Sequence, residues 1–263
     1  MVSYMLRRLG AMVVLVFAAS MIAFIVIELP PGDYVTSYLH QLESSGQMVT
    51  EAQAIALRQR YGLDLPPVLR YFKWLGNLLQ GDLGRSFRYN KPVKELLAER
   101  LPFTFVIAIT TLIFTYLVAI PIGIYSATHQ YSVGDYFFSV LGFAGLAIPS
   151  FLLALILMYV LYTVFGVSIG GLFSLEYRDA PWSIGKVWDL MKHLPVPVVV
   201  VGMAGTAALV RIMRSCLLDE LAKQYVVTAR CKGLTENALV FTYPVRVSIN
   251  PIVSTIGWTL PQI

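Results

Sequence analysis

The chain has 263 residues, of which 57% are hydrophobic and only 13% are charged, and its mean hydropathy is +0.69. Such a composition excludes an ordinary soluble domain and predicts an all-α, polytopic transmembrane helix bundle. The net charge of +5 is spread over several loops rather than gathered in one patch, so we predict membrane lipid and no nucleic acid among the partners.

The first predicted element is a transmembrane helix within residues 1–29. Arg7 and Arg8 precede Leu9–Ile27, an uncharged stretch of about 28 Å as a helix, which is close to the hydrocarbon thickness of a bilayer. A cleaved signal peptide is the alternative, but its apolar core usually has about 7–15 residues and a small-residue cleavage site follows it. The two arginines favour a cytoplasmic N-terminus.

Residues 30–100 are predicted to form an external (periplasmic) helical loop. Two amphipathic helices are expected, at Thr50–Tyr61 and Pro66–Leu79, followed by a turn at Gly81–Gly84 and a short helix from Lys91 to Leu97. The apolar stripe predicted for the second helix consists of Leu69, Phe72, Leu75 and Leu79. We expect such stripes to pack against the membrane spans.

Three further spans are predicted, at Leu101–Thr128, Tyr136–Val167 and Leu194–Val210, with an external loop at Ser168–Lys192. The third span contains Gly142, Gly145 and Pro149, and the fourth has a small-residue face of Gly202, Gly205 and Ala208. Arg211 and Arg214 follow the fourth span and are expected to snorkel at its inner end.

Residues 101–263 are expected to be an incomplete transmembrane core. The last hydrophobic run begins at Ile252 and stops at Ile263, which is about 18 Å of helix, short of the roughly 30 Å that a span requires. We therefore expect a longer reading frame.

A polar, basic loop is predicted at Leu217–Pro251, between two hydrophobic runs. Its first part, Leu217–Cys231, lacks Gly and Pro and should be helical until Lys232 and Gly233, after which Glu236–Phe241 can form a second short helix. The pattern indicates two helices lying across the membrane surface. A connecting segment that merely faces anionic lipid is the alternative.

The residues of this loop resemble a known family. The string DELAKQYVVTARCKGL, Asp219–Leu234, is similar to the cytoplasmic coupling loop of bacterial ABC importer permeases of the dipeptide and oligopeptide branch. The string RQRYGLDLPPVLRYFKWL and the following GDLGRSFRYNKPVKELLAERLPFT are similar to the segment between the first two spans of these permeases. The resemblance implies a transmembrane permease core at 101–263 with a coupling loop at 217–251.

In that family the coupling loop docks into a cleft of the ATP-hydrolysing subunit. The resemblance therefore implies an ATPase-subunit interface, which consists of Glu220, Tyr225, Ala229, Arg230, Lys232 and Gly233. It also implies a bacterial inner-membrane location and four kinds of partner: a second homologous permease subunit, two cytoplasmic ATP-binding subunits and an external substrate-binding protein. The chain itself would not be an enzyme, because the partner subunits use the ATP.

Two departures from the family pattern concern the substrate. Val227 stands where the broader loop pattern has a glutamate, and Arg246 is followed by Val247 rather than by Asn-Ala. Peptides remain the expected substrate, with nickel chelates, glutathione-like molecules and oligosaccharides as alternatives within the branch.

The distribution of basic residues predicts the orientation. With the N-terminus inside, eight Lys and Arg lie inside and three lie in the Ser168–Lys192 loop. The inside residues are Arg7, Arg8, Arg211, Arg214, Lys223, Arg230, Lys232 and Arg246. The nine in the first external loop carry little weight, since that loop exceeds the roughly 60 residues for which the rule holds.

No motif for chemistry is present in the sequence. It lacks a phosphate-binding P-loop, HExxH and GxSxG, and Cys216 and Cys231 have no CxxC spacing, so we predict no catalytic, cofactor-binding or metal site. The predicted spans carry no charge in their interiors, which disfavours a proton-coupled secondary carrier. A structural membrane subunit of an enzyme complex is the other alternative.

Overall fold

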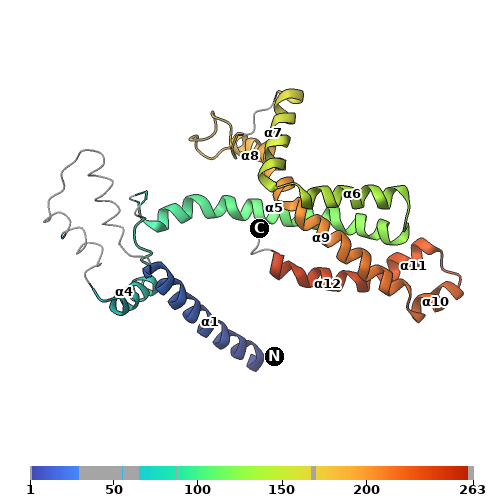
Figure 1. Cartoon of the computed structure of the whole chain (residues 1–263), viewed down its shortest axis with the longest axis horizontal. Coiled ribbons are helices and arrows are strands. Elements are labelled where there is room, and N and C mark those ends of the chain that lie inside the picture. The colour runs from blue at the N-terminus through green and yellow to red at the C-terminus, as the bar shows by residue number, and fades with distance from the viewer. Residues whose placement is uncertain are drawn as a thin grey trace. The chain divides into compact units, whose positions relative to one another are not determined.

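The chain folds as a helical protein. The computed structural model describes residues 2–29, 55, 65–86, 88–89, 91–166 and 170–259, and within these ranges there is one isolated bridge, between Arg85 and Pro92, and no strand. The helices are α1 (Val2–Glu28), α4 (Pro67–Leu79), α5 (Val93–Thr128), α6 (Val133–Ala147), α7 (Ser150–Phe165), α8 (Ile184–His193), α9 (Pro195–Leu221), α10 (Gln224–Cys231), α11 (Glu236–Thr242) and α12 (Pro244–Thr259) (Figure 1).

Several of these helices can cross a membrane. By length and composition α1, α5 and α9 qualify, and the bent pair α6 and α7 qualifies as a fourth span if counted together. The predicted all-α polytopic bundle is confirmed. The chain divides into two compact units, Met1–Arg100 and Leu101–Ile263.

In the first unit, α4 packs against the C-terminal half of α1. The hydroxyl of Tyr71, the buried residue of α4, lies 2.8 Å from the hydroxyl of Ser20, and its ring meets the edge of Phe24. Arg70 forms an ion pair with Glu28 at the end of α1. These contacts hold the first turn of α4 to the first span.

The predicted helix at Pro66–Leu79 is confirmed, but its predicted packing stripe is wrong. Leu69, Phe72 and Leu79 are exposed, whereas Tyr71 is buried and Leu75 is half-buried. Polar pairing decides the rotation of the helix, since the partners of Arg70 and Tyr71 lie on α1. The predicted helix at Thr50–Tyr61 falls outside the described residues, apart from position 55.

Helix α5 is continuous over 36 residues. The separate short helix predicted from Lys91 to Leu97 is therefore wrong, because the same helix continues through Pro102 into the predicted span Leu101–Thr128. The residues before Pro102 are mostly good helix formers, and a proline removes one backbone hydrogen bond without forcing the helix to end.

The third predicted span, Tyr136–Val167, is two helices rather than one. Helices α6 and α7 meet at an angle of 110°. Ile148 between them has extended backbone angles, φ −79° and ψ 123°, because the following Pro149 disfavours a helical conformation at the residue before it. Pro149 also lacks the N–H that would continue the helix.

Helix α9 is the centre of the second unit, where it packs against α6, α7, α8 and α12. Small residues permit close approach, as predicted: a Cβ on Gly202 would lie 3.0 Å from the Phe114 ring of α5. A Cβ on Gly123 of α5 would lie only 2.6 Å from the Cβ of Met213. A side chain at Gly123 therefore requires a shift of one of the two helices, whereas at Gly202 the Phe114 ring would have to give by a few tenths of an ångström.

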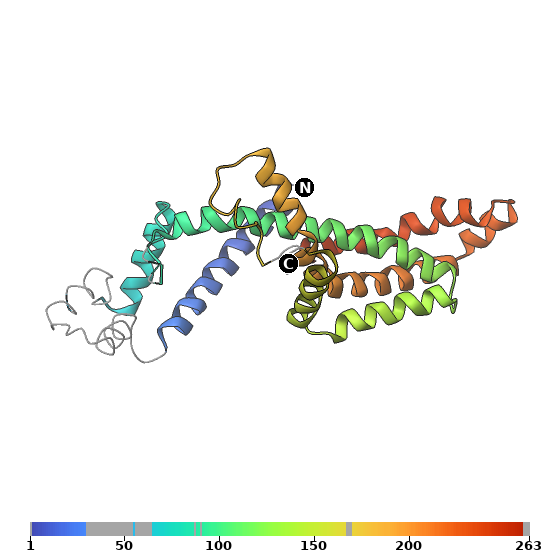
Figure 2. The ribbon, with the colours of Figure 1, turned by 90° about the horizontal axis from the view of Figure 1, so that it is seen from above.

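The second unit has two ends. Figures 1 and 2 show α10 and α11 at one end and α8 at the other. The turn between α5 and α6 and the C-terminus of α9 lie at the α10 end, since Thr128, His129 and Leu221 line the same groove as Arg230. A buried cluster that includes Met213, Leu217, Leu239 and Ile252 holds the three helices α10, α11 and α12 against α9.

Candidate functional site

The polar loop between α9 and α12 is shorter than the sequence predicted. Helix α9 continues to Leu221, so the predicted span Leu194–Val210 and the predicted single helix Leu217–Cys231 both have wrong bounds. Helix α12 begins at Pro244 rather than at Ile252. The connecting segment in the structure is therefore Ala222–Tyr243, in place of the predicted 217–251. From here on, the name coupling loop refers to Ala222–Tyr243.

Glu220, at the end of α9, joins α9 to α10. It is only 9% exposed, and its two carboxylate oxygens accept hydrogen bonds from Lys223 Nζ and Tyr225 Oη, each at 2.6 Å. Burial and the hydrogen bond to the Glu220 carboxylate raise the pKa of Tyr225 to about 12. The phenol therefore stays protonated and remains a donor at physiological pH.

A second ion pair closes the turn between α10 and α11. Arg230 donates from Nε and from one terminal nitrogen to the two carboxylate oxygens of Glu236, at 2.6 and 3.0 Å. This pairing lowers the pKa of Glu236 and raises that of Arg230. Gly233 lies between them with φ +82°, the left-handed conformation that the sequence predicted for it.

The six predicted interface residues, of which Glu220 lies at the end of α9 and the other five lie in the coupling loop, divide into buried and exposed positions. Glu220 and Ala229 are buried, and Ala229 packs in the cluster beneath the loop. Tyr225 is 37% exposed. The remaining three are exposed, namely Arg230, Lys232 and Gly233. Of the six, therefore, four present surface to another protein: Tyr225, Arg230, Lys232 and Gly233.

A groove of about 890 Å³ separates the coupling loop from the end of α5. Tyr125 and His129 line it on the α5 side, and Arg230, Glu236 and Phe241 line it on the loop side. The loop is therefore held by its contacts with α9 and α12 and is incompletely packed against α5.

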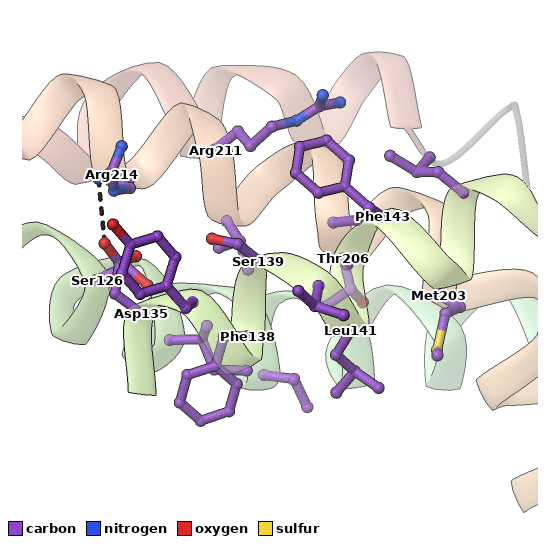
Figure 3. A pocket seen from close by; sticks show the side chains of 18 of the residues that line it. Ser126, Asp135, Phe138, Ser139, Leu141, Phe143, Met203, Thr206, Arg211 and Arg214 are labelled. Carbon is purple, nitrogen blue, oxygen red and sulfur yellow. Dashed lines mark hydrogen bonds and ion pairs between the residues drawn. The ribbon is translucent and has the colours of Figure 1, made fainter. Parts of the chain in front are cut away.

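The structure also forms a pocket of about 600 Å³ among α5, α6 and α9 (Figure 3). At one end Asp135, which is buried, forms an ion pair with Arg214 at 3.2 Å and accepts the Tyr131 N–H at 3.0 Å. These charges lie outside the predicted spans, since Asp135 is in the first turn of α6 and Arg211 and Arg214 follow Val210 in the longer helix α9.

Asp135 lies between the predicted spans Leu101–Thr128 and Tyr136–Val167, and the sequence did not predict its ion pair with Arg214. A signal was present: Ser132 and Asp135 have the Ser-x-x-Asp spacing of a helix start. In the structure the Ser132 side chain accepts the Asp135 N–H and α6 begins at Val133. No local pattern could have paired Asp135 with Arg214, because 79 residues separate them.

Comparison with known families accounts for most of the chain. The family described as "Binding-protein-dependent transport system inner membrane component" matches residues 119–263, which include α6 to α12 and the coupling loop. The N-terminal part of such membrane components matches residues 1–108. The chain belongs to this family of transport permeases.

Several individual relatives can be aligned with nearly the whole of this chain. An oligopeptide transport system permease protein of Bacillus subtilis is 33% identical over a match of 264 positions, which covers 100% of this chain and 80% of that protein. A putative peptide permease protein of Brucella ovis is 34% identical, covering 99% and 79% of the two chains. A di/tripeptide transport system permease protein of Pseudomonas aeruginosa is 30% identical, covering 98% and 79%.

These comparisons confirm the family resemblance and place the permease in the peptide branch of ABC importers. The permease is a multi-pass component of the inner membrane. Among the described residues, no group of three or more His, Cys, Asp or Glu is arranged to hold a metal ion.

Proposed function

We propose that the permease translocates di- or oligopeptides across the inner membrane and that separate subunits hydrolyse the ATP. The relatives that match nearly the whole chain are named as peptide permeases, which supports this substrate class. The complete importer contains a second homologous permease subunit, two cytoplasmic ATP-binding subunits and an external substrate-binding protein.

The proposed orientation places the N-terminus and the coupling loop in the cytoplasm. Arg7 and Arg8 before the first span support it, as does the concentration of basic residues around the coupling loop. Cys231 is exposed on α10 and serves as a natural reporter.

The test of orientation uses Cys231 as the single thiol, after Cys216→Ser. A membrane-impermeant maleimide should label it in inside-out vesicles and leave it unlabelled in intact spheroplasts. Equal labelling from the outer side would contradict the orientation, and Cys231→Ser is the control for background labelling.

The observation that carries the mechanism is the joint at Glu220. Since Glu220 binds both Lys223 and Tyr225, a displacement of α10 is transmitted to the end of α9. Helix α9 in turn packs against α6, α7 and α12. ATP-driven closure of the partner subunits would thus shift α9 and its neighbours between inward-open and outward-open arrangements.

The exposed face of the coupling loop is the proposed ATPase-subunit interface, with Tyr225, Arg230, Lys232 and Gly233 at its surface. Glu220 and Ala229 support it from within, because both are buried. The proposal therefore keeps all six residues in the coupling function but divides them into contacting and positioning residues.

The deciding experiment reconstitutes the complete importer in proteoliposomes and measures peptide uptake together with ATP hydrolysis. We expect uptake to require ATP and the substrate-binding protein. Uptake driven by a proton gradient without ATP would refute the proposal, and so would a substrate-binding protein that delivers nickel chelates or oligosaccharides but no peptide.

A charge-swap series tests the role of Arg230. Arg230→Glu should lower the amount of peptide taken up per ATP, because it places a second carboxylate beside Glu236 and reverses the surface charge. The double variant R230E/E236R restores an ion pair within the loop but keeps the charge at position 230 reversed. We therefore expect thermal stability to recover and peptide uptake to stay low. Full recovery of uptake would remove Arg230 from the interface.

A further inference from the structure

Helix α8 lies at the end of the second unit opposite the coupling loop, and its apolar residues are on the outside (Figures 1 and 2). Four apolar side chains at helical spacing are exposed, namely Ile184, Val187, Trp188 and Met191. Lys186 and His193 of the same helix are buried. An amphipathic helix that faces water has the opposite arrangement. The exposed face of α8 is therefore suited to apolar surroundings.

Polar contacts fix this rotation of α8. The buried ammonium of Lys186 donates a hydrogen bond to the carbonyl oxygen of Ala180 at 2.6 Å, and it lies 5.4 Å from the centre of the Trp182 ring. One turn further along the helix, the carboxylate of Asp189 accepts the N–H of Ser174 at 2.8 Å. Turning the apolar face inward would break both hydrogen bonds and leave buried polar groups without partners, which is costly.

The contacts of α8 with α5 indicate its depth in the membrane. The uncharged run of α5 begins at Leu101. Phe103, in the first turn of this run, stacks on Trp182 just before α8, with ring centroids 6.0 Å apart. Leu190 of α8 belongs to a buried cluster that Val106 packs against, and Val106 is about 7.5 Å of helix beyond Leu101. Interfacial helices lie at such a depth, about 5–10 Å into the boundary between headgroups and acyl chains.

The residues around the exposed face also fit a membrane interface. Trp188 lies within the face, and tryptophan is enriched where the hydrocarbon meets the headgroups. Lys192 is exposed near the end of α8, from which its long side chain can reach the headgroups. A single residue, Leu194, separates α8 from α9, which is long and apolar enough to cross the membrane. The exposed face is thus continuous with a membrane-spanning helix.

We propose that α8 is an interfacial helix whose exposed face is buried in lipid, at the membrane surface opposite the coupling loop. Upper acyl chains cover Ile184, Val187, Trp188 and Met191, and headgroups surround Lys192. Lipid fits this face better than a water-soluble partner, because the face lies beyond the start of the uncharged run of α5. The helix fixes the depth at which α9 enters the bilayer, since one residue joins the two.

The test measures which quencher reaches Trp188 in proteoliposomes that contain the complete importer. The permease has four tryptophans, and the variant W74F/W182F/W258F keeps Trp188 alone. Adding Trp188→Phe gives the matched control, and the difference between the two variants removes the fluorescence of the partner subunits. Lipids brominated near the headgroup end of the acyl chain should lower this difference signal about twofold, and lipids brominated near the methyl end should lower it less. Iodide in the water should change it little.

Three results would overturn the proposal. Quenching by iodide without quenching by brominated lipid would show a face that is open to water or to a soluble partner. Quenching by neither would show a face covered by protein, such as a second permease subunit. Stronger quenching from the methyl end would place Trp188 in the middle of the bilayer rather than at its surface.

A second measurement uses the wild-type permease and does not depend on how the tryptophan variants fold. An apolar diazirine dissolved in the bilayer, once photolysed, should label Ile184, Trp188 and Met191. Leu190 is the internal control, because it is buried on the opposite face of the same helix and should stay unlabelled. Mass spectrometry identifies the labelled residues. Equal labelling of Leu190, or no labelling of α8, would contradict the lipid contact.

Discussion

The hydrogen bond between Tyr225 and Glu220 gives the sharpest test of the coupling loop. Tyr225→Phe removes only the phenol oxygen, which lies 2.6 Å from Glu220 Oε2, and leaves that oxygen without its donor in a residue that is 9% exposed. Hydrogen bonds to charged groups contribute about 1.5–3 kcal/mol. Since Tyr225 is 37% exposed and water can replace part of the bond, we expect a loss near 1.5 kcal/mol.

The functional consequence should exceed the loss of stability. Once this bond is lost, Lys223 and the buried cluster are the described side-chain contacts that still hold α10 against α9, so a push on α10 is transmitted less completely. We expect ATP hydrolysis to continue while peptide uptake per ATP falls. Thermal unfolding in detergent measures the stability change, and simultaneous assay of phosphate release and uptake in proteoliposomes measures coupling.

Tyr243→Phe is the matched control. Tyr243 ends the same loop and is 42% exposed, and its hydroxyl forms no hydrogen bond within the part of the chain that the structure describes. Its loss should change neither stability nor coupling. Our reasoning about Glu220 would be refuted if Tyr225→Phe behaved as Tyr243→Phe does in both assays.

Three further variants test the backbone and the packing. Gly233→Ala should cost about 1 kcal/mol of loop stability because Gly233 has φ +82°, whereas Gly257→Ala in open helix should be neutral or stabilising; thermal unfolding would show the difference. Asp135→Asn should destabilise by about 3 kcal/mol, and the double variant D135L/R214M by less, since removing one partner leaves the other charge unpaired; equal losses would contradict the ion-pair argument. Gly123→Ala should cost about 1–3 kcal/mol and separate α5 from α9, which a loss of cross-linking between cysteines on these helices would detect.

Much of the fold followed from local sequence. The uncharged run Leu9–Ile27 predicted the first span, because the transfer free energy of apolar side chains adds along a helix of sufficient length. Gly233 predicted a left-handed turn, since glycine alone adopts that conformation without strain. The polar composition between α9 and α12 predicted a loop, and its residues predicted the family.

The bounds of helices were less predictable where two signals competed. Pro102 is compatible with the interior of α5, whereas Pro149 coincides with a 110° bend. Both prolines remove one backbone N–H, and the surrounding packing decides whether the helix continues. Residue types alone do not distinguish these outcomes.

Only the tertiary structure decided which side chains meet. Asp135 and Arg214 are far apart in sequence, and the burial of Glu220 and Ala229 and the rotation of α4 depend on how each helix turns toward its neighbours. Hydropathy along a chain reports whether a segment leaves water, because each residue contributes to that free energy separately. It does not report helix rotation or register, which depend on the fit and hydrogen bonding of side chains from different helices.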